Sequence, residues 1–277
     1  MDTDLARTFL AIAACGSFQQ AAERMHLTQS ATSMRIRRLE ERLGCRLFVR
    51  SKNGARLTAQ GHAFYPHAAE LLRAVHQAEN AVLAPETPAG LVVVGARLAL
   101  WQDWLVGAVA GMQARLGPNR VRMHIGFEAD LIENVVLGRV SVAVLFTPQS
   151  RPGLTVEHLY EDVLRLARHD GPRDDYIAVD WGPDFERHFT MAFPEQPHAP
   201  VEADVGWLAM RYMRTHGGSA YLPDRLLTGL RSRDFEIDRT APPFKLPVYM
   251  VYASAEAEAL AGYLSTIREA LSGRFGG

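Results

Sequence analysis

The chain has 277 residues, of which 48% are hydrophobic, and its formal net charge is −1. That length exceeds one typical domain of ~100–200 residues and suits two domains that each bury a core. No apolar run approaches the ~20 residues of a membrane-spanning helix, and the polar start Met-Asp-Thr-Asp does not fit a signal peptide. We therefore expect a cytoplasmic protein.

The charges are unevenly distributed. Residues 1–58 contain ten Lys and Arg against five Asp and Glu, a net of +5, and the remainder holds 20 basic and 26 acidic residues, a net of −6. Because phosphate neutralisation dominates affinity for nucleic acid, a basic module joined to an acidic body is typical of a polyanion-binding head.

The cysteines and histidines form no metal or cofactor motif. Cys15 and Cys45 are too far apart for a CxxC pair and too few for a disulfide framework. We expect reduced thiols used in packing, since the alternative, a redox sensor, needs an electropositive exposed thiolate. His62 and His67 are five residues apart, which does not stack them on one helical face as a zinc pair requires. The sequence predicts neither a metal nor a cofactor.

Helical periodicity begins near the N-terminus. A first helix is predicted from the recurrence of Leu5, Phe9, Ile12 and Ala13, and Gly16 ends it. Ser17 and Gln20 form a capping box that opens a second short helix. The apolar face of that second helix contains Phe18, Ala21, Ala22 and Met25.

A third helix follows a tight turn, with Thr28 as its expected N-cap and Gly44 as its end. Its core-facing stripe holds Thr32, Ile36, Leu39 and Leu43. Its opposite arc presents Ser30, Ser33, Met34, Arg37 and Arg38. A tight helix pair whose second member offers hydroxyls and arginines outward fits a recognition helix in the DNA major groove.

A hairpin is predicted next, because Asn53-Gly54 lies between the short apolar segments 47–51 and 55–58. As a wing, it would carry Arg50 and Lys52 to phosphates or to the minor groove. Within a helix-turn-helix at 18–37 and this wing, the predicted DNA-contacting residues are Gln29, Ser30, Thr32, Ser33, Met34, Arg35, Arg37, Arg38, Arg50 and Lys52.

Residues 9–61 include the segments SFQQAAERMHLTQSATS, RRLEERLGCRLFVR and LTAQG. This run resembles the N-terminal region of LysR-type transcriptional regulators. The alternative is a three-helix protein-interaction domain with a basic face. Met34 departs from the family, which often has a polar side chain at this groove-facing position, and a thymine-methyl contact is more plausible there.

After Thr58, apolar residues recur at alternating steps of four and three. They are Phe64, Ala68, Leu71, Val75, Ala78 and Val82. This heptad spacing predicts a seam between two chains, although one amphipathic helix could bury the same stripe within its own domain. The resemblance, whose members dimerise through this helix, favours the first reading. Pro66 predicts a late start or a kink, and a linker begins at Pro85.

From residue 91, short apolar strands alternate with helices. Strands are predicted at 91–96, 120–127 and 140–146, with helices at about 104–116 and 131–137 between them, as a βαβαβ unit. Further strands are predicted at 163–169, 176–181, 219–223 and 245–253. The residues alone support an α/β domain. The resemblance implies two lobes, like those of periplasmic solute-binding proteins.

We therefore expect an all-α winged helix-turn-helix domain (1–58), a linker and dimerisation helix (59–84) and a two-lobed α/β effector-binding domain (90–277). Lobe I would take about 90–161 and 246–277, and lobe II about 162–245. The segments LALWQDWL (98–105) and VDWGPDF (179–185) resemble the family's subgroup that includes a repressor of the flagellar master operon. The resemblance implies a homodimer on double-stranded operator DNA with two half-sites, two dimers assembling through their bodies into a tetramer, and a small-molecule effector.

The sequence does not predict an enzyme. It contains no GxSxG, P-loop, GxGxxG or HExxH motif, and Asp130 and Glu133 fit a solvated helix face better than an acid/base pair. Two competing classes are an enzymatic or solute-binding α/β domain with an incidental helix-turn-helix, and a nucleoid-type protein without an effector.

An effector site is expected outside the carboxyl ends of the parallel strands. The predicted effector contacts are Arg97, Leu98, Ala99, Trp101, Glu128, Phe146, Thr147, Gly217 and Gly218. Family members commonly carry a small hydroxyl residue after the first strand, where this chain has the bulkier Arg97 and Leu98. Arg97 either binds an anion as a fork or pairs with an acid across the lobe interface. Trp101 and Trp104 either lie beside the ligand or fill the core.

Overall fold

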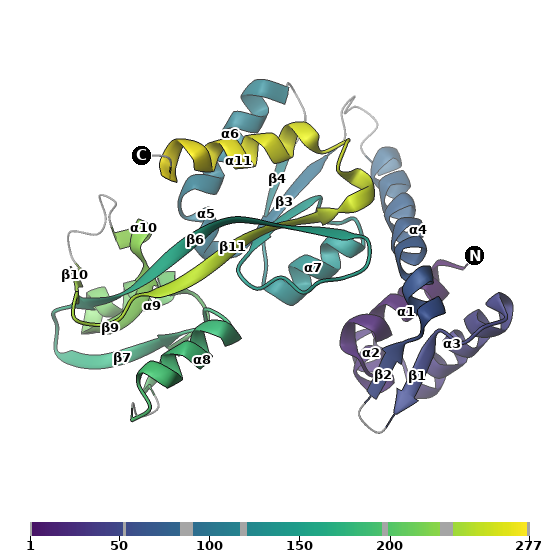
Figure 1. The fold of residues 1–277 in the computed structure, drawn as a ribbon, viewed down its shortest axis with the longest axis horizontal. Helices are drawn as coiled ribbons and strands as arrows, with labels where there is room; N and C mark the ends of the chain where they lie inside the picture. The colour runs from purple at the N-terminus through teal and green to yellow at the C-terminus, as the bar shows by residue number, and fades with distance from the viewer. Residues whose placement is uncertain are drawn as a thin grey trace.

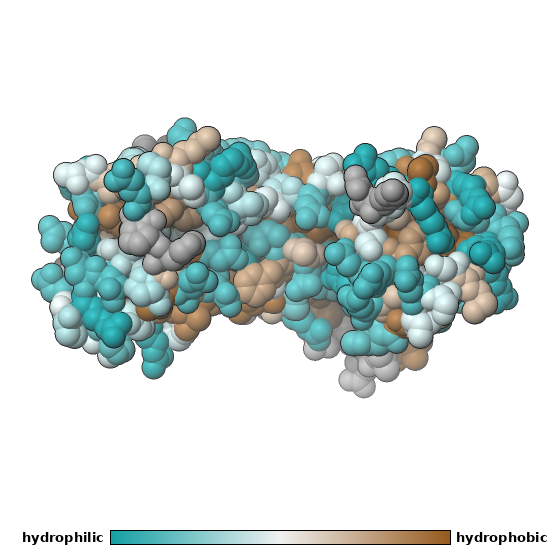
Figure 2. Space-filling view, turned by 90° about the horizontal axis from the view of Figure 1, so that it is seen from below, coloured by the Kyte–Doolittle hydropathy of each residue, from teal (hydrophilic) through white to brown (hydrophobic). Residues whose placement is uncertain are grey.

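The computed structural model describes residues 2–51, 54–83, 91–116, 121–195, 199–227 and 235–275. A helical head and a two-lobed body are joined by one long helix (Figure 1). Seen from below, the molecule is elongated, and most of this face is hydrophilic (Figure 2). No helix within the described ranges is long and apolar enough to cross a membrane.

The head contains α1 (Thr3–Cys15), α2 (Phe18–Arg24), α3 (Gln29–Leu43), β1 (Phe48–Ser51) and β2 (Gly54–Leu57). Its helix ends follow the sequence signals. The backbone N–H of Ala31 donates to Thr28 Oγ1 at 3.1 Å, which makes Thr28 the N-cap of α3. Gly16 and Gly44 end α1 and α3 in the left-handed region, with φ of 66° and 68°, where a residue with a Cβ is strained.

The last turn of α3 differs from the predicted stripe. Leu43 is 41% exposed, whereas Glu40 is only 8% exposed. The Glu40 carboxylate accepts the backbone N–H groups of Leu47 at 2.8 Å and Phe48 at 3.4 Å. Buried N–H groups need acceptors, so Glu40 rather than Leu43 faces inward and joins α3 to β1.

Helix α4 (Ala59–Leu83) connects head to body. The expected late start is wrong, because α4 begins at Ala59 and continues through Pro66, with Thr58 Oγ1 accepting the backbone N–H of Gly61 at 2.9 Å. Pro66 removes only one backbone hydrogen bond of this long helix. The predicted linker from Pro85 to residue 90 lies outside the described residues.

The body is built on one sheet of order β4-β3-β5-β11-β6-β9-β7-β8, with β10 beside β6. The long strands β6 (Leu154–His169) and β11 (Phe244–Ala253) run through both lobes. Lobe I also holds β3 (Val92–Ala96), α5 (Leu98–Trp101), α6 (Trp104–Leu116), β4 (Val121–Ile125), α7 (Glu128–Val136), β5 (Val142–Leu145), η1 (Ser254–Glu256) and α11 (Ala261–Phe275). Lobe II holds β7 (Arg173–Val179), α8 (Pro183–Ala192), β8 (Val201–Ala203), α9 (Gly206–His216), β9 (Gly217–Pro223), α10 (Asp224–Leu227) and β10 (Glu236–Ile237).

Both faces of the lobe I sheet are covered, as the apolar strands predicted. Val92 and Val94 pack in the core under α5, α6 and α11, whereas Val93 packs on the other face against α7. This alternation follows from the two-residue period of a strand. Helix α7 begins three residues earlier than predicted, at Glu128, and the short helix α5 was not predicted.

In lobe II, strands β8, β7 and β9 are parallel to one another, and β9 is antiparallel to β6. The carboxyl ends of these three parallel strands point toward lobe I. Arg97 of lobe I accordingly reaches the backbone carbonyl of Asp180, the residue directly after β7. The two-lobed α/β architecture expected from the sequence is therefore confirmed.

Candidate nucleic-acid interface and the contact between the lobes

The outer arc of α3 is free for contact with another molecule. Gln29, Ser30, Arg37 and Arg38 are exposed, Ser33 is half-buried and Met34 is 67% exposed. Within the described part of the chain, neither Arg37 nor Arg38 makes an ion pair or a side-chain hydrogen bond. A row of hydroxyls and unpaired guanidinium groups on a protruding helix suits base edges and phosphates.

Two residues of the predicted contact set serve the head itself. Thr32 has no exposed surface, and its hydroxyl donates to the Thr28 carbonyl at 3.1 Å, so its assignment to the DNA surface is corrected. Arg35 is half-buried and binds Asp4 at 3.0 Å, which ties α3 to α1. The helical period places Thr32 on the stripe that faces the core, and because the side chain is buried there it packs within the head instead of contacting DNA.

The wing places Arg50 beside α2. The Arg50 guanidinium carbon lies 3.8 Å from the centroid of the Phe18 ring, and the side chain remains exposed. A cation over an aromatic face loses freedom without losing its charge, which holds Arg50 in position for a phosphate. Lys52 lies outside the described residues.

The predicted dimer seam is divided along α4. Ala68 is fully buried in the head's own core, and the Phe64 ring lies 5.0 Å from that of Phe9. Leu71 packs partly against the same core, and Val75 is half-buried. Ala78 and Val82 are exposed, Val82 at 77%. The first half of the seam therefore packs within the chain, which corrects the assignment of Phe64 and Ala68.

Arg97 lies at the contact between the lobes and is only 4% exposed. Its Nη1 donates to Glu128 Oε2 at 3.2 Å within lobe I, and its Nη2 donates to the lobe II carbonyl of Asp180 at 2.9 Å. A longer bond of 3.4 Å joins Nη2 to the Asp204 carbonyl. Of the two alternatives, pairing with an acid is the one observed, although that acid belongs to lobe I.

A second buried arginine crosses the same boundary in the opposite direction. Arg225 of α10 is 8% exposed, and its Nη1 donates to the lobe I carbonyl of Ala99 at 2.8 Å. Its Nε donates to Asp162 Oδ2 at 2.8 Å, and Asp103 lies 3.8 Å away. Burial raises the pKa of the Asp162 carboxyl above its ordinary value. No sequence motif marked Arg225 or Asp162, because they are 63 residues apart.

Apolar side chains complete the lobe contact. Phe146 of lobe I and Trp181 of lobe II lie edge to face, with ring centroids 6.0 Å apart. A Cβ on Gly182 would lie 3.1 Å from Thr147 Oγ1, and its φ of 94° also favours glycine. Leu98 is half-buried at the start of α5. Trp181 lies within the predicted strand 176–181, and strand periodicity does not indicate its contact with the other lobe.

Trp101 and Trp104 fill the core. They are 7% and 4% exposed, and their indole N–H groups donate to the His124 carbonyl at 2.9 Å and the Tyr160 hydroxyl at 3.0 Å. Of the two alternatives for these indoles, core packing is the one observed. Trp181, whose N–H donates to the Tyr221 carbonyl at 2.9 Å, is the indole at the lobe contact.

Gly217 and Gly218 do not face Arg97. They begin β9, whereas the end of β9 at Pro223 lies toward lobe I, and Gly218 pairs with His169 at the far end of β6. The assignment of both glycines to the effector site is therefore corrected. Ligands in such sheets bind at carboxyl ends of strands, and these glycines stand at an amino end.

The cysteines and histidines show no cofactor arrangement in the described ranges. Cys15 and Cys45 are free and half-buried. Among the described residues, no group of three or more His, Cys, Asp or Glu side chains is placed to hold a metal ion.

Comparison with known proteins adds the following matches. Residues 3–62 match the family of bacterial regulatory helix-turn-helix proteins of the lysR family. The HTH-type transcriptional regulator HdfR of Yersinia pestis (strain Pestoides F) is 28% identical over 268 residues, spanning 91% of this chain and 90% of the relative. Family and relative are transcriptional regulators, not enzymes.

Two solved structures have the same fold. Full-length CbnR complexed with its target DNA aligns with a TM-score of 0.56 at 18% identity, covering 98% of this chain and 100% of CbnR. Full-length LysG from Corynebacterium glutamicum with bound effector Arg aligns with a TM-score of 0.55 at 19% identity, covering 98% of each chain.

Proposed function

The chain belongs to the LysR family of transcriptional regulators, and on that premise we propose that α3 reads operator DNA in the major groove while Arg50 of the wing contacts the neighbouring backbone. The observation that carries this proposal is the outer arc of α3, where Arg37 and Arg38 are exposed and unpaired within the described residues. We assign DNA binding to residues 1–58, with its contact set reduced to Gln29, Ser30, Ser33, Met34, Arg37, Arg38, Arg50 and Lys52.

Selection from a random duplex library tests this proposal. The full chain should enrich one sequence containing two half-sites about one helical turn, or a multiple of it, apart. Binding that enriches no sequence would instead support the nucleoid-type alternative. A genome-wide map of bound sites would then give the target genes and, with transcript levels, the direction of regulation.

We propose that two chains dimerise through residues 59–84, using the second half of the α4 seam. Val75, Ala78 and Val82 support this, because their spacing continues the heptad while their side chains stay half-buried or exposed. Val75→Asp should separate the dimer in sedimentation experiments, since a seam cannot bury an unpaired charge. Ala74→Asp, at an exposed neighbouring position, is the matched control. An unchanged oligomer for Val75→Asp would contradict the seam.

Assembly of two dimers through the bodies is supported by β4. This edge strand exposes Met123 at 55% and Ile125 at 59%, so a second copy could cover it. Ile125→Lys should leave dimers but no tetramers at equal protein concentration. If the Ile125→Lys variant still forms tetramers, the contact between two dimers lies outside β4.

We propose that residues 90–277 bind a small-molecule effector between the lobes, in a cytoplasmic regulator. The support is the Arg97 contact, because a ligand that displaces the Asp180 and Asp204 carbonyls would change the spacing of the lobes. The effector surface retains Arg97, Leu98, Ala99, Glu128, Phe146 and Thr147 from the sequence prediction and adds Asp180 and Trp181.

Tryptophan emission during a metabolite screen tests the effector site, with Trp181→Phe identifying which indole responds. An effector should shift emission in the parent, not in Trp181→Phe, and bind more weakly to Arg97→Ala. If a compound changes DNA binding while Arg97→Ala retains full affinity for it, the effector binds away from the lobe contact.

A further inference from the structure

Helix α7 of lobe I lies on the side of the body that faces the head (Figure 1). We propose that the outer face of α7 is a docking surface for the DNA-binding head of the same chain, and that α7 couples the lobe contact to the orientation of that head. This inference rests on the proposed DNA-binding function, which the experiment below tests separately.

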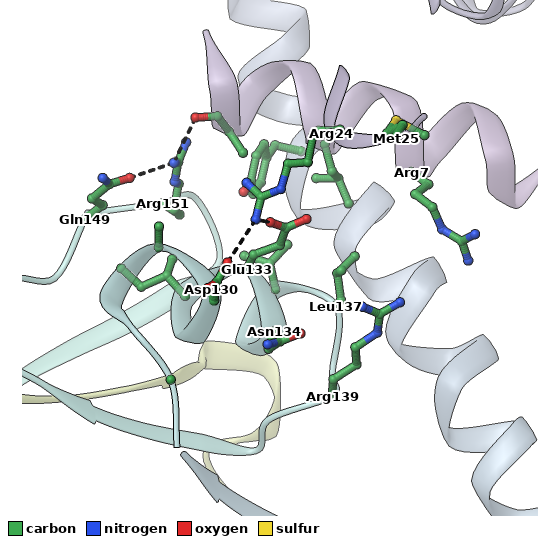
Figure 3. Close-up of a pocket in the computed structure, with 18 of the residues that line it drawn as sticks. Arg7, Arg24, Met25, Asp130, Glu133, Asn134, Leu137, Arg139, Gln149 and Arg151 are labelled. Atoms are coloured by element: carbon green, nitrogen blue, oxygen red, sulfur yellow. Dashed lines mark hydrogen bonds and ion pairs between the residues drawn. The ribbon is translucent and has the colours of Figure 1, made fainter. Parts of the chain in front are cut away.

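An ion-pair cluster forms the first part of the docking surface. Arg24 at the end of α2 reaches toward α7, where its guanidinium pairs with Glu133 and lies 3.4 Å from Asp130 (Figure 3). The Glu133 side chain is 26% exposed, so solvent screens its charge less than that of Asp130, at 63%. The Arg24 and Glu133 pair is therefore the main electrostatic contact.

Arg151 forms the second part, from the loop before β6. It donates to the carbonyls of Ala13 at 3.0 Å and Ala14 at 3.3 Å, and Gln149 Oε1 holds the same guanidinium at 2.7 Å. These carbonyls lie in the last turn of α1, which carries the negative end of the helix dipole and lacks further N–H donors. Lobe I thus supplies a positive cap to a helix of the head.

Apolar packing joins α7 to the head and to α4. Val136, the last residue of α7, is 4% exposed and belongs to the same hydrophobic cluster as Phe9 and Tyr65. Arg73 of α4 donates to the Val136 carbonyl at 3.3 Å. A Cβ on Gly138 would lie 2.7 Å from Arg73 Cγ, so the two elements meet without space for a side chain.

The same helix also touches the lobe contact. Glu128, in the first turn of α7, pairs with Arg97 at 3.2 Å. One helical turn separates Glu128 from Ile132 and a second reaches Val136, so a short rigid helix carries any displacement of its first turn to the head. The recognition helix α3 lies on the opposite side of the head (Figure 1). Docking therefore leaves α3 accessible and fixes its direction, which determines the distance between two half-sites in a dimer.

Charge exchange across Arg24 and Glu133 tests the docking. Arg24→Glu and Glu133→Arg are compared with the parent on a single half-site and on duplexes that carry two half-sites at different spacings. Relative to its own affinity for the single half-site, each single variant should lose about three- to tenfold in affinity at the parent's preferred spacing. The double variant should recover that spacing preference. Arg168→Glu, which breaks an ion pair with Asp238 in lobe II, is the matched control.

Mixed dimers distinguish docking within a chain from docking between chains. When Arg24→Glu and Glu133→Arg copies are combined, docking within a chain leaves both contacts broken, whereas docking between chains restores both. Recovery in mixed dimers would overturn the assignment to the same chain. Unchanged spacing preference in both single variants, or losses that merely add in the double variant, would overturn the docking itself. A parent chain that binds no DNA would refute the proposed function instead.

Discussion

Arginine has opposite roles in the head and in the body. Arg37 and Arg38 are exposed without a partner among the described residues, whereas Arg97 and Arg225 are 4% and 8% exposed and bind carbonyls across the lobe boundary. The head therefore presents a surface that is complete before DNA arrives. In the body, the guanidinium groups already donate hydrogen bonds to the protein's own carbonyl oxygens, so an effector that binds them would have to displace those carbonyls. Burial, rather than residue type, separates these roles.

The largest effect is expected from Arg225→Leu. This change leaves the Asp162 carboxylate, 3% exposed, without its main partner, and removing one partner of a buried pair costs about 3–5 kcal/mol in the free energy of unfolding. Urea denaturation should show the loss. Arg187→Leu removes an exposed partner of Asp184 and should cost less than about 0.5 kcal/mol. Similar losses in the two variants would contradict the contrast between buried and exposed arginines.

The loss in Arg225→Leu should depend on pH. Burial already raises the pKa of Asp162 above its ordinary value in the parent, and removal of the cation raises it further. The folded variant then binds a proton more tightly than the unfolded chain does. Its deficit relative to the parent is thus greatest above the raised pKa and decreases as the pH falls through that pKa. A deficit that grows on acidification would mean that Asp162 is not the group left unpaired.

Arg37→Ala should have an intermediate effect, on DNA binding rather than on stability. Loss of a base-edge contact costs about 1–3 kcal/mol at the selected site and relaxes specificity at one base pair. Because Arg37 has no intramolecular partner among the described residues, unfolding should be unaffected. Arg42→Ala, in the last turn of the same helix, is the control. If the affinity falls equally on the selected and on random duplexes, Arg37 contacts only phosphates and no base edge.

The smallest effect is expected from Met34, which is 67% exposed on the reading face. Met34→Ala should cost less than about 1 kcal/mol, because it removes only apolar contact with a thymine methyl group. Replacing the thymines of the selected site one at a time by deoxyuridine should reproduce the loss at one position for the parent, and not for Met34→Ala. If none of these replacements weakens binding of the parent, Met34 does not contact a thymine methyl group.

Local features of the fold were predictable, whereas long-range ones were not. Thr28 and Gly16 act through neighbours within four residues, so their capping roles follow from short sequence patterns. Gly217 and Gly218 were assigned to the wrong end of lobe II, because the direction of β9 depends on its pairing with β6 and β7. The ion pair between Arg225 and Asp162 likewise depends on how β9 pairs with β6.

The linker helix shows a second limit. Heptad spacing selected Phe64, Ala68 and Leu71, but the face that packs most deeply also includes Tyr65 and Leu72, at 2% and 5% exposure. An apolar stripe can be buried by another element of the same chain or by a second chain, and both arrangements give the same periodicity. Only the way the head and α7 pack against α4 distinguishes burial within the chain from burial by a second chain.

The two arginines that cross the lobe boundary have a mechanical consequence. Arg97 fixes one point of lobe I to lobe II through Asp180, and Arg225 fixes a second point through Ala99. The strands β6 and β11 also run through both lobes, so while these two contacts hold, the main motion left to the lobes is rotation about the line through the two points, allowed by bending of the strands. While both contacts last, the lobes can neither slide nor separate, and any small motion reduces to one angle. A ligand wedged to one side of that line would set the sign of the angle, so ligands on opposite sides would turn the lobes in opposite senses.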